Sequence, residues 1–164
     1  MDDSIRKMID ENPLLSFSLY TSAQVQTLRN VGEELIGSSE NWTDTITDLQ
    51  RVYDFFWLWV LGAYEVVRTM SQNKECFSTS VREQIVEQKR ALATIRMPFA
   101  KQELKGNGKP VYSELSVKGI NKGMVFVISG ETYNSTTVVE SFLGFIDGIK
   151  TGDVINEIPV NRPN

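Results

Sequence analysis

The sequence predicts a mainly α fold with a small β-hairpin (α+β), which has four or so helices, a long antiparallel helical hairpin as its core, and short strands in the C-terminal half. Two observations predict it. Apolar residues recur at helical spacing over two long segments that only a short polar stretch separates, and two such helices normally pack antiparallel. After Leu104 the pattern changes to turn clusters and alternating apolar residues, which is typical of strands.

The N-terminal part contains one predicted helix. Residues 1–20 have a weak pattern that Pro13 interrupts, so we expect a weakly structured lead-in. A helix is predicted from Thr21, and Gly37-Ser38-Ser39 is expected to end it. Its apolar residues at helical spacing are Val25, Leu28, Val31 and Leu35.

The strongest predicted element is a helix over residues 43–72, which no proline interrupts. At 1.5 Å per residue it reaches about 45 Å, long enough to form the backbone of the fold. Its predicted apolar stripe consists of Ile46, Leu49, Tyr53, Phe56, Trp57, Val60, Tyr64 and Val67.

A third helix is predicted from Val81, and Pro98 should end or kink it because proline lacks the N–H donor and crowds the preceding turn. Residues 111–117 alternate as a half-buried strand does, and Met124–Ile128 form a short apolar run that suits a buried strand. Turn clusters at 105–110 and 118–123 precede these two strands.

A last helix is predicted to end near Ile149, with Thr137 and Glu140 as a capping box at its start. The tail that follows is expected to add a short strand around 154–158 or to stay loose. The whole chain, 1–164, is expected to be one domain: a lead-in over 1–20, a helical core over 21–104, and the hairpin, last helix and tail over 105–164.

Composition excludes several function classes. The chain has no histidine, which removes Ser–His and Cys–His catalysis, histidine metal sites and imidazole proton transfer. No phosphate-binding loop is present, because GNGKP at 106–110 lacks the required spacing. We therefore predict no metal site and no cofactor, and we do not favour an enzyme.

Three features of the sequence predict the cellular compartment of the protein. Cys76 is the only cysteine, so no internal disulfide forms. The charged N-terminus lacks the apolar core of a signal peptide. The longest apolar run, residues 55–64, is about half the length of a bilayer span. We expect a soluble cytoplasmic protein without membrane contact.

The long helix carries a stripe that is apolar in its middle and charged at both ends. The middle consists of Leu58 and Leu61. Arg51 and Asp54 lie at one end of the stripe, and Glu65 and Arg68 lie at the other. A buried ion-pair network, an acid/base pair and half of a dimer seam are the functional alternatives. The ordinary interpretation is two separate i,i+3 ion pairs, because Asp54 and Glu65 are about 16 Å apart along the axis.

Aromatic residues on the same helix point in several directions, so protein is expected to surround it on most sides. A plain core is the ordinary interpretation, and a ligand pocket around Trp57 and Tyr64 is the functional one. Gly62 within this run predicts close approach of a neighbouring helix. The pocket or interface candidates are Trp57, Gly62, Tyr64, Glu65 and Arg68.

Charge differs between the two halves of the chain. Residues 1–75 hold six basic against twelve acidic side chains, whereas the remainder has eleven against nine. The basic excess gathers in one window, which predicts an anion or nucleic-acid site, a contact with an acidic partner surface, or ordinary solvated surface. The candidates in this window are Lys89, Arg90, Arg96, Lys101, Lys105, Lys109, Lys118 and Lys122.

Three functional hypotheses follow. The first is a small binding or regulatory protein that acts through protein–protein contacts as a homodimer. The second is a non-catalytic RNA- or DNA-associated module that uses the basic window at 89–122. In architecture its long helical hairpin is similar to the nucleotide-binding helical domains of bacterial stress and defence ribonucleases, whose catalytic Arg-to-His motif cannot exist without histidine. The third is a small-molecule binder with an aromatic pocket.

Overall fold

The protein is mainly helical, with a small antiparallel sheet in its C-terminal half, as the sequence predicted. The computed structural model describes residues 3–41, 46–101, 103, 119–120 and 122–159. The α-helices are α1 Asp3–Glu11, α2 Leu19–Glu40, α3 Ile46–Gln72, α4 Thr79–Lys101 and α5 Ser135–Gly148. Short 3-10 helices are η1 Pro13–Leu15, η2 Lys74–Cys76 and η3 Thr151–Asp153.

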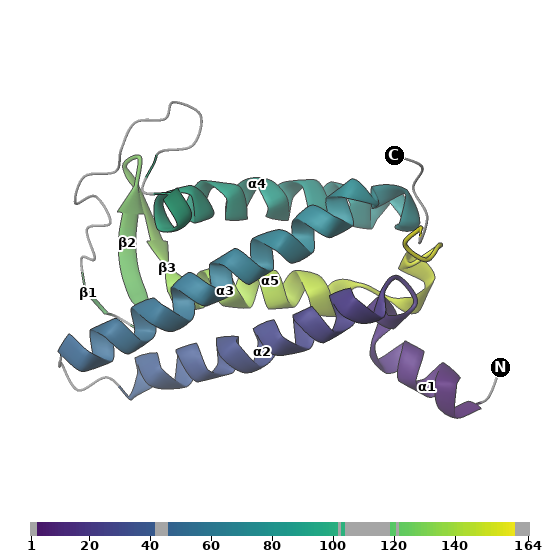
Figure 1. Ribbon diagram of the computed structural model, residues 1–164, viewed down its shortest axis with the longest axis horizontal. Helices are drawn as coiled ribbons and strands as arrows, with labels where there is room; N and C mark the ends of the chain where they lie inside the picture. Colours follow the sequence, from purple (N-terminus) through teal and green to yellow (C-terminus); the bar gives the residue numbers. More distant parts are fainter. Residues whose placement is uncertain (1–2, 42–45, 102, 104–118, 121, 160–164) are drawn as a thin grey trace.

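The four long helices run along the longest axis of the molecule (Figure 1). The sheet lies at one end, and α1 and η3 lie at the other. α3 contacts both α2 and α4, which places it in the middle of the bundle. The antiparallel pair of long helices, α3 and α4, therefore forms the centre of the fold, as expected.

Two helices continue past residues at which the sequence predicted a change: α2 was expected to end at Gly37-Ser38-Ser39, and the third helix was expected to end or kink at Pro98. α2 runs through Gly37-Ser38-Ser39 to Glu40, and the Ser39 hydroxyl donates to the Leu35 carbonyl inside the helix at 2.9 Å. α4 continues through Pro98 to Lys101. Pro98 is buried, and the next carbonyl, that of Phe99, accepts the Trp57 indole N–H at 3.0 Å. Packing against α3 thus holds the last turn of α4 in place despite the missing proline donor.

Structure near the N-terminus is more regular than the sequence predicted. α1 forms where a weakly structured lead-in was expected, and none of its side chains is buried. α2 begins with Ser18 as its N-cap, whose hydroxyl accepts the Thr21 N–H at 3.3 Å.

The sheet has the order β1-β2-β3, with β1 Gly119–Ile120, β2 Met124–Ile128 and β3 Glu131–Asn134. β2 is the strand predicted at 124–128. Its hairpin partner is β3, which the sequence analysis missed; the partner predicted at 111–117 lies outside the described residues. Ile128 pairs with Glu131 across the two-residue loop Ser129-Gly130, and both loop residues have positive φ, as in a type I′ turn.

α5 begins at Ser135, earlier than predicted. Its N-cap is Asn134, whose side-chain oxygen accepts the backbone N–H groups of Thr136 at 2.9 Å and Thr137 at 3.4 Å. The predicted capping box at Thr137 and Glu140 is therefore wrong, because both residues lie inside the helix. A single asparagine binds two of the free N–H groups of the first turn.

The described part of the tail, residues 151–159, is not loose but forms a strap across one end of the bundle. Val154 forms an isolated bridge with Phe77. Ile155 N–H donates to the Cys76 carbonyl at 2.9 Å, and Ile158 N–H donates to the Phe17 carbonyl at 2.9 Å. The strap therefore ties the start of α2 to the connection between α3 and α4.

One contiguous apolar cluster fills the bundle. α3 supplies Val52, Phe56, Trp59, Val60, Ala63, Val66, Val67 and Met70 to it. The buried stripe is therefore rotated from the predicted one, and Ile46 is 85% exposed. Gly62 confirms the predicted close approach, because a Cβ there would lie 3.0 Å from Leu28 Cδ2 of α2.

Candidate functional site

The outer face of α3 is open to solvent, so the expectation that protein surrounds this helix on most sides is wrong. At the middle of this face Leu58 is 56% exposed and Trp57 37% exposed. α3 packs between α2 and α4 but leaves one side uncovered, and its buried residues do not include Trp57 or Leu58. Exposed apolar side chains of this size on one face are a feature of interaction surfaces.

Charged groups of opposite net sign lie at the two ends of this face. At one end Arg51 forms an ion pair with Glu34 of α2, not with Asp54 as predicted. Asp54 accepts a hydrogen bond from the Gln50 side chain at 2.7 Å. One base with two acids gives this end, defined by Glu34, Arg51 and Asp54, a formal charge of −1.

The other end combines residues of α3 and α4. Glu65 pairs with Arg68 at 2.7 Å, as predicted, and with Arg96 at 3.9 Å. The Arg96 guanidinium also lies over the Tyr64 ring, 4.6 Å from its centre. This end, defined by Glu65, Arg68 and Arg96, has a formal charge of +1.

Next to Leu58 the surface is hollowed into an apolar groove of about 370 Å³ between α2 and α3. Its floor is low because Gly62 has no side chain, and Leu28 lies directly against that position. We call it the α2–α3 groove, and its lining residues are Gln24, Thr27, Leu28, Val31, Leu58, Trp59, Gly62 and Glu65.

The predicted pocket or interface candidates fall on two sides of α3. Gly62 and Glu65 line the α2–α3 groove. Tyr64 and Arg68 lie with Arg96 toward α4, and the Trp57 indole N–H is bound by the Phe99 carbonyl at the end of α4. The structure therefore places these residues along an outer surface rather than around one aromatic pocket.

The basic window is divided between different surfaces. Lys89 and Arg96 contact α3, through Ser71 at 3.1 Å and through Glu65. Arg90 and Lys101 are exposed about 100° further around α4. Lys122 is exposed at the turn before β2. Lys105, Lys109 and Lys118 lie outside the described residues.

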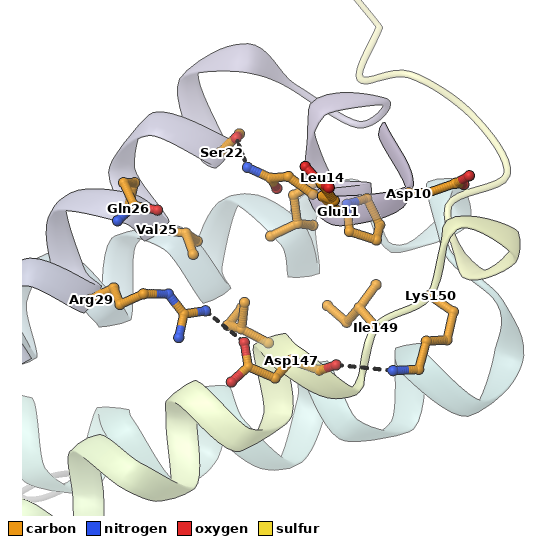
Figure 2. A pocket seen from close by; sticks show the side chains of 13 residues that line it. Asp10, Glu11, Leu14, Ser22, Val25, Gln26, Arg29, Asp147, Ile149 and Lys150 are labelled. Carbon is orange, nitrogen blue, oxygen red and sulfur yellow. Dashed lines mark hydrogen bonds and ion pairs between the residues drawn. The ribbon is translucent and has the colours of Figure 1, made fainter. Parts of the chain in front are cut away.

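A second hollow, a polar cleft of about 490 Å³, opens at the far end of the bundle, where the α1–η1 elbow, α2 and the end of α5 meet (Figure 2). Its floor is apolar and consists of the buried side chains of Leu14, Val25, Ile146 and Ile149. Charged and polar side chains rise around this floor: Asp10, Glu11, Asn12, Ser22, Gln26, Arg29, Asp147 and Lys150.

Hydrogen bonds fix the walls of the cleft. Arg29 of α2 donates to Asp147 of α5 at 2.6 Å, and Lys150 donates to the Asp147 carbonyl at 3.3 Å (Figure 2). On the α1 side, Asn12 donates to the buried Ser22 hydroxyl at 2.7 Å. The elbow after α1 is thereby attached to α2.

Sequence reasoning missed this cleft completely. Its residues come from three segments far apart in the chain, 10–14, 22–29 and 146–150, and no motif links them. The one available signal was the spacing of Ser22, Val25, Gln26 and Arg29, which share one face of α2.

No protein-family model, curated protein or solved structure matches this chain. Within the described residues, no helix combines the length and apolar character needed to cross a membrane. In the same part of the chain, no three acidic or cysteine side chains are grouped so that they could hold a metal ion.

Proposed function

We propose that the protein acts through protein–protein contact as a homodimer, with the outer face of α3 and the α2–α3 groove as its interface. The observation that carries this proposal is that the projecting Leu58 and the hollow at Gly62 lie side by side on one helix face. A surface that carries both a projection and a matching hollow is able to pair with itself.

Sequence spacing supports a two-fold arrangement. Leu58 and Gly62 are four residues apart and so lie on the same side of α3. A two-fold axis near Val60 that crosses two α3 helices in antiparallel fashion sets Leu58 of each copy opposite the partner's Gly62. Each leucine then enters the other copy's groove, as in the ridges-into-grooves packing of helices.

Charge supports the same arrangement. An antiparallel two-fold brings the end with charge −1, Glu34, Arg51 and Asp54, against the end with charge +1, Glu65, Arg68 and Arg96. A parallel arrangement would bring like charges together. Charge complementarity of this kind selects orientation more than it adds affinity.

The first test is the oligomeric state of Leu58→Glu, measured by sedimentation velocity across micromolar concentrations. Burying a leucine contributes about 1.5 kcal/mol, and symmetry counts it twice, so the variant should dimerise about 100-fold more weakly. Val86→Glu is the matched control, because Val86 is also 56% exposed on a long helix, α4. A monomeric wild type, or equal effects of the two variants, would overturn the proposal.

The second test addresses orientation. Arg68→Glu and Asp54→Arg each give the two ends the same sign, so each alone should weaken the dimer. Together they exchange the signs of the two ends and should restore it. Failure of the double variant to recover would contradict the antiparallel arrangement, and the recovery should diminish at high salt.

A further inference from the structure

The polar cleft is a separate site from the proposed interface, although α2 contributes to both. α2 carries two stripes of residues at helical spacing. Gln24, Thr27, Leu28 and Val31 face the α2–α3 groove, whereas Ser22, Val25, Gln26 and Arg29 face the cleft. A volume of about 490 Å³ lies within the range of about 300–1,000 Å³ that is typical of small-molecule sites.

Arg29, on the α2 wall of the cleft, has more N–H donors than its hydrogen bond to Asp147 uses. A guanidinium has five N–H donors, and its hydrogen bond to Asp147 occupies one of them. The Arg29 side chain is 30% exposed, so it is partly shielded from water where it borders the cleft. A guanidinium binds a carboxylate or a phosphate through two parallel hydrogen bonds, and the excess of acidic side chains around this cleft favours the less highly charged carboxylate.

The opposite wall is acidic. Asp10 and Glu11 end α1 beside the cleft, at the C-terminal end of that helix, where the backbone dipole also favours a positive group. Asp10 accepts the Thr151 hydroxyl at 3.0 Å, which positions its carboxylate between α1 and η3. Glu11 pairs with Lys7 at 3.8 Å, but both side chains are about 70% exposed or more, so this ion pair is weak.

We propose that this cleft binds a short apolar peptide, of about two residues, as a zwitterion. Its carboxylate lies on Arg29, its terminal ammonium lies on Asp10 and Glu11, and its side chains cover the apolar floor of Leu14, Val25, Ile146 and Ile149. The wall formed by α2 and the end of α5 carries Arg29, Lys150 and Asp147, with a formal charge of +1, and the α1 wall carries Asp10 and Glu11, with a formal charge of −2. Walls of opposite sign on two sides of an apolar floor favour a ligand whose two charges are separated by an apolar body. In a free amino acid the ammonium and the carboxylate are attached to one carbon, so they lie closer together than the two charged groups of a dipeptide.

The test uses leucyl-leucine as the probe, with binding measured by calorimetry on the full chain. N-acetyl-leucyl-leucine lacks the ammonium, leucyl-leucine amide lacks the carboxylate, and free leucine lacks the separation between the charges. Each should bind about tenfold more weakly than the unmodified dipeptide, because each loses a charge-assisted contact. No binding of the dipeptide at millimolar concentration, or equal binding of all four molecules, would overturn the proposal.

Variants locate the site. Arg29→Gln should weaken the dipeptide about tenfold and leave its amide unchanged, because the amide already lacks the group that Arg29 binds. Asp10→Asn should weaken the dipeptide and leave the acetylated form unchanged. Arg90→Gln and Glu87→Gln, at exposed positions of α4, are the matched controls and should have no effect. Equal loss with every form of the ligand would assign the residues to folding rather than to binding, and would refute the assignment.

The experiments can refute the dimer interface and the dipeptide site independently of each other. Leu58→Glu lies on the other side of α2 from the cleft and should leave dipeptide affinity unchanged, whereas Arg29→Gln should leave the oligomeric state unchanged.

Discussion

Replacing Gly123 with alanine should destabilise the fold by about 3 kcal/mol. Gly123 has φ +136°, a conformation that costs an L-residue about 1–2 kcal/mol. A Cβ there would also lie 2.3 Å from Asn134 Oδ1 and 2.6 Å from Thr136 Oγ1. Asn134 is the N-cap of α5 and would have to move, and loss of such a cap costs about 1 kcal/mol more.

Two other glycines separate these contributions when unfolding is measured with urea. Gly130 has φ +86°, and nothing lies within 4 Å of the position that an added methyl group would take, so Gly130→Ala should cost the backbone strain alone, about 1–2 kcal/mol. Gly144 is exposed inside α5 with similar open space, so Gly144→Ala should stabilise by up to about 1 kcal/mol.

The comparison can refute this reasoning directly. If Gly123→Ala lowers the free energy of unfolding no more than Gly130→Ala does, a methyl group at position 123 does not displace the α5 N-cap Asn134. A double variant with Asn134→Ala gives a second check, because the cap contribution is then already lost. The double variant should cost less than the sum of the two single variants if the added methyl group displaces Asn134.

Three further predictions concern single side chains. Burial, and after it the hydrogen bond to Glu131 and its negative charge, raise the pKa of Tyr133 to about 12. The unfolded chain loses this proton near pH 10, so stability should fall as pH rises from 10 toward 12, and Tyr133→Phe should remove that part of the loss in alkaline urea titrations. The Ser78 hydroxyl, which donates to Asp153 at 2.6 Å, and after it the Lys150 backbone N–H, lower the pKa of Asp153; Ser78→Ala should therefore destabilise the protein at neutral pH, with a difference from wild type that shrinks as pH falls below about 4. Trp59 is 1% exposed and donates to a buried carbonyl at 3.0 Å, so Trp59→Phe should cost about 2–3 kcal/mol in thermal or urea unfolding.

The long helices could be predicted because each buries one continuous side, which leaves a periodic signal in the sequence. The ends of these helices were harder to predict from the sequence. Pro98 and Gly37 have unfavourable helix propensity, yet both lie inside helices. Pro98 is itself buried, and Gly37 lies between the buried residues Leu35 and Ser39, whose packing outweighs the local preference. Nothing in the segment around Pro98 reveals that the Trp57 indole, from a different helix, binds the next carbonyl.

The sheet and the sites depend on pairing between distant segments. β2 has a clear apolar run, but β3 has only four residues and none of them is fully buried, so the Ser129-Gly130 turn was its one local signal. For the interface, the charged ends and apolar middle of α3 were visible in the sequence. Which side of that helix faces water could not be predicted, because packing against α2 and α4 decides it. The cleft needed three segments that only the fold brings together.

The accessibility of Cys76 depends on the strap that follows α5. Cys76 is only 5% exposed, and its Sγ lies 3.4 Å from the Glu157 carbonyl. Part of that cover comes from the segment 154–158, whose backbone N–H groups bind the carbonyls of Cys76 and Phe17. Local opening of this segment exposes the thiol to reagents and oxidants while the helices stay folded. The rate at which a thiol reagent labels Cys76 in the folded protein therefore reports how often this segment detaches.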